Sequence, residues 1–486
     1  MIFRKKTDFS RSGEKKPRLW QALLPVVILV ALLFVNVRYF DDALGGANQT
    51  VLLLAALVCG LLGWSNGVKW KTMRDKIIHT IHTALEPIII LLLIGALSGA
   101  WMISGIIPMM IYYGVSIMHP AFFLAAVVVI CSVVSLATGS SWSTIATIGV
   151  AIIGIGNAFG MPHGLVAGAV ISGAYFGDKM SPLSDTTNLA AAVGGTNLFT
   201  HIRYMVFTTL PAWALTFIIF AVIGIFKSAY GMTPDTDYIR QHIGAQFNTS
   251  PWLLLAPAVL IIIIIKKIPA IPAMVVGILL GVLCALVFQS DLLGNLVAAG
   301  SFENRYQLLM QAVMGDMSLH TGVNEIDKLL STSGMSGMLH TIFLIISAMI
   351  FGGMMDACGC LARITGALIS LVVNRTSLVG STLLTGIIFN ITTCDQYLSI
   401  IISGKMWQNI YREKGYQPEV LSRALEDSST VTSVLIPWNS CGATQAKVLG
   451  VATLDYLPYC FFNMLSPLVN LTLTALNIKI RMHKPL

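Results

Sequence analysis

Long apolar stretches separated by short polar segments run through most of the chain. The hydrocarbon core of a bilayer is about 30 Å thick, so a helix needs roughly 20 apolar residues to cross it. Several stretches are too short or too polar to cross completely, so we predict an all-α polytopic membrane protein with broken helices or hairpins and about 10–13 transmembrane helices. The candidate spans lie near residues 20–38, 50–67, 87–111, 119–137, 142–159, 163–177, 204–227, 251–266, 269–288, 338–358, 376–391, 396–410, 431–450 and 456–478.

The composition supports the same class. Of the 486 residues, 56% are hydrophobic and 11% are charged, whereas a soluble domain carries about 25% charged residues. This excludes soluble enzymes, nucleic-acid-binding proteins and disordered scaffolds. The formal net charge of +8 does not indicate a nucleic-acid partner, because Lys and Arg lie mostly beside apolar stretches, where they orient helices in the bilayer.

The charged segments also predict an orientation and a domain plan. Basic residues near both ends indicate that the N-terminus and the C-terminus are cytoplasmic, and the more acidic segment 289–336 should face outward. We predict a basic N-terminal tail at 1–18, a first transmembrane repeat at 19–228, an external linker at 229–250, a second transmembrane repeat at 251–480 and a C-terminal tail at 481–486.

The two halves share polar landmarks at a nearly constant spacing of 249 to 255 residues. The span near 87 should leave the cytoplasm, whereas the span near 338 should enter from outside. This predicts two inverted-topology repeats, the plan of many secondary transporters, with the binding site near the membrane midplane. Chance similarity between apolar helices is the alternative, but the matched positions are polar: Ser140 with Thr393, Asp178 with Asp427, Pro182 with Pro437, and Asn188 with Asn439.

Polar residues within membrane spans are costly and usually functional, and four polar clusters interrupt the apolar sequence. The first contains Thr138, Ser140 and Ser141 around Gly139. Isolated hydroxyls in a membrane helix often bond only to the preceding turn, but this density favours a helix break or hairpin tip. Such a break would offer hydroxyl and carbonyl oxygens to an ion.

The second cluster spans residues 176–190 and centres on Asp178. Pro182 cannot donate a backbone hydrogen bond to the carbonyl of Asp178, so this residue should offer both a carboxylate and a free carbonyl. Hard cations favour such oxygen ligands. An exposed turn, with polar side chains capping the next helix, is the alternative. Lys179 is a candidate counter-charge, and the oxygen set would be completed by Ser184, Asp185, Thr186 and Asn188.

The third and fourth clusters lie in the second half. The third contains Asp395 between apolar stretches, with Lys405 as the nearest basic candidate, and a helix cap at the membrane surface is its alternative. In the fourth, Pro437 should free the carbonyl of Ser433. One of the adjacent acids Glu426 and Asp427 is expected to be solvated. The candidate ion-binding residues from these clusters are Asn390, Thr393, Asp395, Asp427, Thr432 and Asn439.

The run Gly-Asp-Lys-Met-Ser-Pro-Leu-Ser-Asp-Thr-Thr-Asn-Leu-Ala at 177–190 closely resembles the NhaC-type Na⁺/H⁺ antiporter family. Further similar motifs lie at 138–142, 395–400 and 426–442, and the likeness extends from about residue 20 to residue 478. The resemblance implies a multi-pass transporter of the bacterial cytoplasmic (inner) membrane that expels Na⁺ against inward H⁺. The same family is thought to include malate/lactate exchangers and amino-acid carriers.

These observations predict a secondary active transporter in which Na⁺ and H⁺ compete for one carboxylate, Asp178 or Asp185. Asp395 and Asp427 would contribute from the other repeat, and Na⁺ would lie at Asp178, Asp185 and Asp395. Burial favours the neutral acid and a bound cation favours the carboxylate, so each ion would displace the other. We expect no cofactor. The expected partners are Na⁺, H⁺, the lipid bilayer and a second copy of the chain in a homodimer.

Two other functions are alternatives to this interpretation. An exchanger of a small organic anion or amino acid would need a fixed positive charge facing the solute, for which Lys179, Lys405 and Arg363 are candidates. An intramembrane aspartyl protease would use paired aspartates for acid–base chemistry. Its Gly-x-Gly-Asp motif is absent, since residues 175–178 read Tyr-Phe-Gly-Asp, so we do not expect an enzyme.

Overall fold

A computed structural model describes residues 15–39, 46–229, 236–266, 268–300, 302–318, 327 and 331–482. Most of the predicted tail 1–18 and of the tail 481–486 therefore lies outside the described residues, as do parts of the predicted segments 229–250 and 289–336. The described chain is helical apart from a two-stranded antiparallel sheet, β1 (Met317–Ser318) with β2 (Ser331–Thr332). The predicted all-α class is confirmed.

The first half of the chain contains helices of very different lengths. Two of its spans are interrupted, one between α6 and α7 and one between α9 and α10. In chain order the helices are α1 (Leu19–Tyr39), α2 (Ala47–Ser65), α3 (Trp70–Thr83), α4 (Leu85–Ile103), α5 (Ile106–Ile117), α6 (Pro120–Thr138), α7 (Ser141–Thr144), the π-helix η2 (Ile145–Gly149), α8 (Val150–Ala158), α9 (His163–Met180), α10 (Asp185–Gly194) and α11 (Leu198–Ala229).

The second half is interrupted in the same way, between α20 and α21 and between η5 and α23. Its helices are α12 (Thr236–Gln246), η3 (Pro251–Leu254), α13 (Leu255–Ile265), α14 (Ala270–Phe288), α15 (Ser290–Ala298), α16 (Arg305–Met314), η4 (Ser336–Met338), α18 (Leu339–Ala357), α19 (Cys360–Ile369), α20 (Arg375–Thr392), α21 (Gln396–Glu413), α22 (Pro418–Leu425), the π-helix η5 (Glu426–Thr430), η6 (Ser433–Leu435), α23 (Ser440–Leu449), α24 (Thr453–Tyr456), η7 (Leu457–Tyr459) and α25 (Phe461–Ala475).

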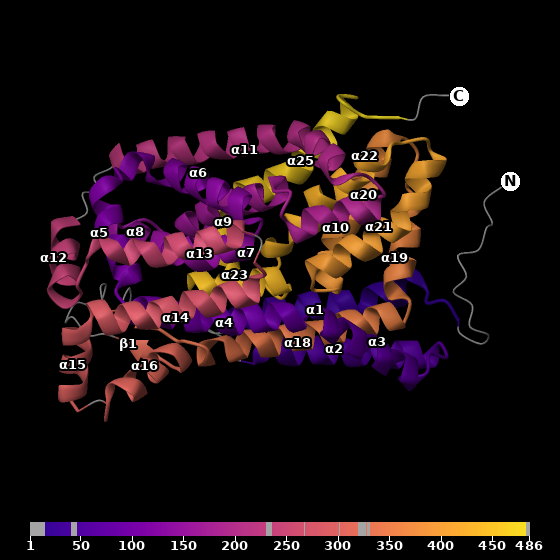
Figure 1. The fold of residues 1–486 in the computed structure, drawn as a ribbon. Helices are drawn as coiled ribbons and strands as arrows, with labels where there is room; N and C mark the ends of the chain where they lie inside the picture. The colour runs from indigo at the N-terminus through magenta and orange to yellow at the C-terminus, as the bar shows by residue number, and fades with distance from the viewer. Residues whose placement is uncertain are drawn as a thin grey trace.

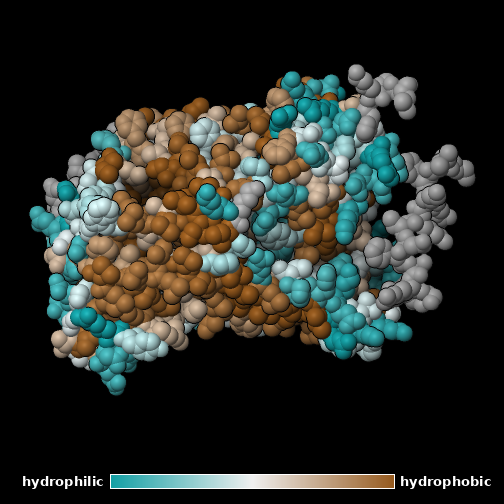
Figure 2. Space-filling model, in the orientation of Figure 1, coloured by the Kyte–Doolittle hydropathy of each residue, from teal (hydrophilic) through white to brown (hydrophobic). Residues whose placement is uncertain are grey.

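The long helices run along one common direction, with α4, α14 and α18 on one side of the molecule and α6 and α11 on the other (Figure 1). The interrupted elements α7, α9 and α23 lie near the middle of that long dimension. Figure 2 shows a broad hydrophobic band across the middle of this face, with hydrophilic residues gathered at its two ends. A bilayer would cover such a band and leave both ends in water.

Eight of the described helices are long and apolar enough to cross a membrane, by length and composition alone. Residues 240–246 and 251–265 form a pair bent by 91° that could make a ninth span. The predicted number of about 10–13 is higher. The difference arises because α9, α20 and α21 carry the polar clusters, and α25 has only 15 residues.

Backbone turns recur at one spacing in the two halves. Four pairs of residues with positive φ are separated by 254 or 255 positions: Gly105 with Gly359, Gly139 with Cys394, Gly160 with Gly415, and Gly195 with Gly450. The same offset pairs Ser140 with Asp395, two residues away from the pairing with Thr393 that was expected from the sequence. The repeated turns support two repeats, and their opposite orientation across a membrane stays a prediction.

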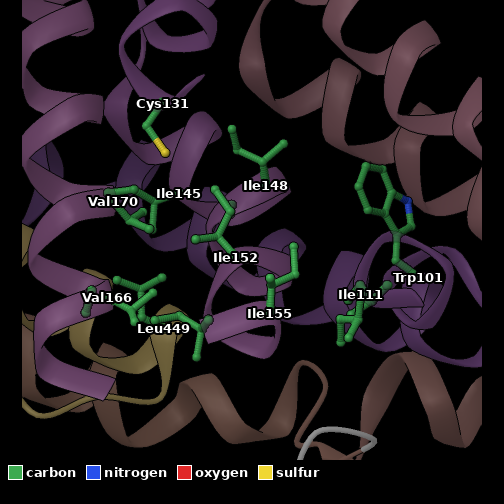
Figure 3. Packing of buried hydrophobic residues seen from close by; sticks show 14 of the residues in the cluster. Trp101, Ile111, Cys131, Ile145, Ile148, Ile152, Ile155, Val166, Val170 and Leu449 are labelled. Atoms are coloured by element: carbon green, nitrogen blue, oxygen red, sulfur yellow. The ribbon is translucent and has the colours of Figure 1, made fainter. Parts of the chain in front are cut away.

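Two glycines on α9 place Asp178 beside the first polar cluster. Gly173 and Gly177 lie one turn apart on α9, and a Cβ atom at either position would overlap the α6 backbone at Val128 or Ser132. Small residues with this spacing let helix backbones approach closely. The η2–α8 segment packs beside α9, with Ile145 next to Val170 (Figure 3). Asp178, at the end of α9, is therefore held next to the start of α7.

Candidate functional site

The break between α6 and α7 is present where the hydroxyl run predicted it. Gly139 has φ 72°, which ends α6, and Ser140 then caps α7 by accepting a hydrogen bond from the Ser143 N–H at 3.1 Å. The hydroxyl oxygens of Thr138 and Thr144 are 3.3 Å apart. These side chains stabilise the break itself, and the N-terminus of α7 is left facing Asp178.

Asp178 is buried, and its carboxylate receives two hydrogen bonds from one residue. The backbone N–H of Ser141 donates to Oδ2 at 3.0 Å, and the Ser141 hydroxyl donates to the same oxygen at 2.7 Å. The predicted free carbonyl is wrong, because the carbonyl of Asp178 accepts a hydrogen bond from the Ser181 N–H at 3.0 Å. The last turn of α9 closes with a hydrogen bond between residues three apart instead of four. The Asp178 carbonyl, which Pro182 cannot reach with an N–H, therefore still has a partner.

The rest of the second cluster forms the start of α10. Ser184 is the N-cap, with its hydroxyl 3.4 Å from the Thr187 N–H and 3.1 Å from the Thr186 hydroxyl. Asn188 is exposed and donates to the carbonyls of Pro182 and Ser184 at 3.1 and 2.7 Å. Asp185 is the first residue of α10 and its side chain is exposed. This cluster therefore combines a buried carboxylate with an exposed one.

In the second half, Asp395 occupies the position equivalent to Ser140. It caps α21 by accepting from the Leu398 N–H at 3.0 Å, and it also accepts from the Ser440 hydroxyl at 3.1 Å. Thr393 bonds back to the carbonyl of Phe389 at 2.8 Å. The helix-cap alternative is right about the role of Asp395, and the capping residue is only 1% exposed.

Three further predicted residues form one buried network. The Asn390 side-chain amide donates to the Ser429 carbonyl at 2.8 Å and to the Thr432 hydroxyl at 3.0 Å. The Asn439 amide donates in turn to the Asn390 carbonyl at 3.0 Å. This network joins α20, the segment containing η5 and η6, and the start of α23. The network holds the segment from η5 to α23 against α20.

Tyr397 relates the three candidate sodium ligands to one another. It interacts electrostatically with Asp178, Asp185 and Asp395, and Asp178 also interacts with Asp185. The packing of α10 against α21 brings Tyr397 near the start of α10. Carboxylates from the two halves, more than 200 residues apart in the chain, therefore lie around one tyrosine. Tyr397 is not among the residues predicted from the sequence, because a single tyrosine beside an apolar stretch carries no distinctive signal.

Lys179 and Asp427 form an ion pair in which both side chains are fully buried. The Asp427 carboxylate also accepts from the Ser466 hydroxyl at 2.5 Å and from the Asn470 amide at 2.8 Å, and Lys179 donates to Ser466 at 2.9 Å. Lys179 therefore neutralises Asp427 rather than its neighbour Asp178. The carboxylate of Asp427 is surrounded by donors, which does not fit the predicted contribution to a cation site.

The other predicted counter-charge lies elsewhere. Lys405 is exposed on α21, ten residues after Asp395, which corresponds to about 15 Å along the helix axis. Within the described chain no ion pair joins these two residues. Arg363, a third candidate positive charge, is exposed on α19. Neither side chain is placed to balance the carboxylates near Tyr397.

Glu426 and Asp427 are both fully buried, so the prediction that one of them is solvated is wrong. Their segment η5 is enclosed by α20, α21, α22 and α25, which leaves no face in water. Within the described part of the chain, neither carboxyl oxygen of Glu426 has a hydrogen-bond partner. π-helical turns such as η5 are frequent at functional sites. The only signal in the sequence was the polar run from Glu426 to Thr430.

Carboxylate and hydroxyl oxygens dominate the cluster, and these are the ligands that hard cations prefer. Among the described residues, no group of three or more His, Cys, Asp or Glu side chains could hold a metal ion. Interrupted helices beside buried carboxylates near the middle of a helical bundle are typical of secondary transporters.

Comparison with known proteins agrees with this geometry. Residues 173–478 match the Na⁺/H⁺ antiporter family. The chain is 35% identical to the Na⁺/H⁺ antiporter NhaC of Alkalihalophilus pseudofirmus, over 96% of this chain and 97% of that protein. It is 34% identical to the malate-2H⁺/Na⁺-lactate antiporter of Bacillus subtilis, over 91% and 92% of the two chains.

A third relative is the arginine/ornithine antiporter ArcD of Halobacterium salinarum, which is 34% identical over 97% of this chain and 95% of that protein. The named relatives thus transport different solutes at nearly equal identity to this chain. Each of them aligns with more than nine-tenths of this chain and of its own length. On these grounds the chain belongs to the Na⁺/H⁺ antiporter family.

Proposed function

We propose that this protein is a secondary active transporter that exchanges Na⁺ for H⁺ across the bacterial cytoplasmic membrane. The observation that carries the proposal is the buried carboxylate of Asp178, which accepts two hydrogen bonds from Ser141 at the start of α7 and lies near Asp185. The relatives named as Na⁺/H⁺ antiporters support the choice of ions. We place both chain ends on the cytoplasmic side.

Exchange follows from competition between the two ions. A carboxyl group away from water is more stable when it is protonated or when it binds a cation than when it is ionised alone. Arrival of Na⁺ at Asp178, Asp185 and Asp395 therefore releases a proton, and protonation releases Na⁺. If the site opens to one side of the membrane at a time, one gradient drives the other without a covalent step.

Asp178→Asn tests the proposal in everted membrane vesicles. Asparagine keeps the shape of the side chain but cannot exchange a proton, so we expect Na⁺-dependent dissipation of the pH gradient to fall to background. Asp356→Asn is the matched control, because Asp356 pairs with Lys76 at 2.8 Å in a partly exposed contact between α18 and α3. Unchanged Na⁺-dependent proton movement in Asp178→Asn would show that Asp178 is not part of the site.

A second candidate function is exchange of a small organic anion or an amino acid. The relatives named as malate-2H⁺/Na⁺-lactate and arginine/ornithine antiporters favour it. The positive charges predicted for such a solute do not support it, since Lys179 is paired and Lys405 and Arg363 are exposed. Counterflow of radiolabelled malate, lactate or tyrosine in proteoliposomes separates the two functions, because a cation-only exchanger would accumulate none of them.

A further inference from the structure

Arg423 is a fully buried arginine on α22 whose side chain was not selected from the sequence. Among the described residues, its Nε, Nη1 and Nη2 atoms all lack a hydrogen-bond acceptor. A guanidinium group carries five N–H donors in a planar fork and stays protonated in proteins. Few buried groups therefore leave so much hydrogen-bonding capacity and charge unbalanced.

The neighbours of Arg423 compensate it only in part. The ring of Tyr204 lies 4.4 Å from the guanidinium carbon, which is a cation–π contact. Removing an ion from water costs more free energy than one such contact returns. Tyr411 interacts with Arg423 electrostatically, but its hydroxyl is already 3.0 Å from that of Thr382. The buried charge of Arg423 therefore stays partly uncompensated unless another acceptor binds to it.

The two carboxylates nearest to Arg423 along the chain do not pair with it. Glu419, one turn before Arg423 on α22, accepts from Arg481 at 3.0 Å. Glu426, one turn after it, makes no hydrogen bond to Arg423 and interacts instead with Lys179, Asp178 and Asp427. No described acidic residue therefore pairs with Arg423, so the acceptor that it lacks would come from outside the described chain.

The position of Arg423 suits a ligand that enters from one end of the molecule. Arg481, 48% exposed, marks the surface beside Glu419, and Arg423 lies four residues further along the helix, which is about 6 Å. The Lys179–Asp427 pair lies another four residues inward. Arg423 therefore stands between the surface and the buried ion pair, on the helix segment that also carries Glu426.

We propose that Arg423 binds the carboxylate group of a small organic anion. The planar fork of an arginine matches the two oxygens of a carboxylate, and the resulting pair of charge-assisted hydrogen bonds supplies both the acceptors and the opposite charge. This site goes beyond exchange of Na⁺ and H⁺. It provides the positive charge that an organic-anion exchanger needs and that Lys179, Lys405 and Arg363 do not provide.

Thermal unfolding of the purified full-length protein tests the proposal, with malate, lactate, chloride and inorganic phosphate added separately at equal ionic strength. A ligand that binds only the folded protein raises its unfolding midpoint. We expect malate or lactate to raise the midpoint of the wild-type protein and chloride and phosphate to leave it unchanged. No rise with either carboxylate, or an equal or larger rise with an inorganic anion, would overturn the proposal.

Arg423→Met keeps a long side chain and removes the charge. We expect its midpoint without ligand to be equal to or above that of the wild type, because an unpaired buried charge is lost, and we expect the carboxylate effect to disappear. A large fall without ligand would show that the guanidinium is already satisfied within the fold and would refute the proposal. Arg412→Met, at an arginine on α21 that donates to Asn409 at 3.0 Å, should respond to carboxylates like the wild type.

Isothermal titration with malate or lactate adds a graded comparison. Charge-assisted hydrogen bonds are worth enough that Arg423→Gln should weaken carboxylate binding by about ten- to a hundredfold. Arg423→Lys should lie between wild type and Arg423→Gln, since an ammonium keeps the charge but not the fork. Equal affinities in all three proteins would contradict the proposal, even if Na⁺/H⁺ exchange were intact.

Discussion

At the scale of single residues, the buried pair of Lys179 and Asp427 has the largest energetic consequences. Both side chains are excluded from water, and Ser466 and Asn470 complete the hydrogen bonds of the carboxylate. Such a pair adds little stability compared with apolar residues of the same volume, but breaking it leaves one charge buried alone. The pair joins α9 to η5 and so links the two halves of the chain.

We predict that Asp427→Asn lowers the free energy of unfolding by about 3–5 kcal/mol, because Lys179 would remain charged without a partner. Chemical or thermal unfolding in detergent measures this change. The double variant Lys179→Met with Asp427→Leu should recover most of the lost stability. If the single variant were as stable as the wild type, the ion pair could not be the contact that holds α9 against η5.

At the scale of elements, the interrupted helices decide where the polar groups lie. Gly139 and Cys394 both have positive φ, at 72° and 59°, and each separates a long helix from a capped one. Positive φ is ordinary for glycine but uncommon for cysteine. The backbone at Cys394 is held in place by the hydrogen bond that its carbonyl accepts from the Ser440 N–H at 2.9 Å.

The close approach of α6 and α9 leads to a testable prediction. At Gly177, an added Cβ would overlap the carbonyl of Ser132, so Gly177→Ala should push the helices apart and cost about 1–3 kcal/mol. The Ser141 hydrogen bonds to Asp178 should lengthen, and Na⁺-dependent transport should fall at unchanged expression. Gly366→Ala on α19 is the control, since its Cβ would meet open space. Equal effects of the two substitutions would refute this account of the contact.

At the scale of the whole molecule, a hydrophobic band with polar ends covers the face seen in Figure 2, and a group of acidic residues is buried inside. The cluster is separated from bulk water by packed helices, so ionisation and cation binding are linked. Protons and Na⁺ occupy the same carboxylates in the proposed cycle. The pH therefore sets the fraction of these carboxylates that is free to bind Na⁺.

This linkage predicts that the apparent affinity for Na⁺ falls as the pH falls. Below the pH at which the competing carboxyl is half protonated, one proton must leave for each Na⁺ bound, so the affinity should change about tenfold per pH unit. At high pH the carboxyl is already ionised and the affinity should level off. Titration of purified protein with Na⁺ over a pH series measures the slope. A Na⁺ affinity independent of pH would exclude competition for one carboxyl.

Several parts of the site could be predicted from local sequence. The hydroxyls around Gly139 and the proline after Asp178 indicated both breaks, because glycine and proline act on the backbone within a few residues. The partners of the buried charges could not be predicted in this way. Adjacent acids such as Glu426 and Asp427 look alike in sequence, and only the enclosure of η5 by four helices buries both.

The sequence alone determined the helical membrane class, the polar clusters and the positions of the interruptions, since apolar length and backbone chemistry act locally. Only the tertiary structure decided that Lys179 pairs with Asp427, that Asp178 is bound by Ser141 and that Arg423 is buried without an acceptor. Those contacts depend on which helices pack together. Distance in space and exclusion of water set the energy of a charge, and neither quantity is encoded by any short stretch of residues.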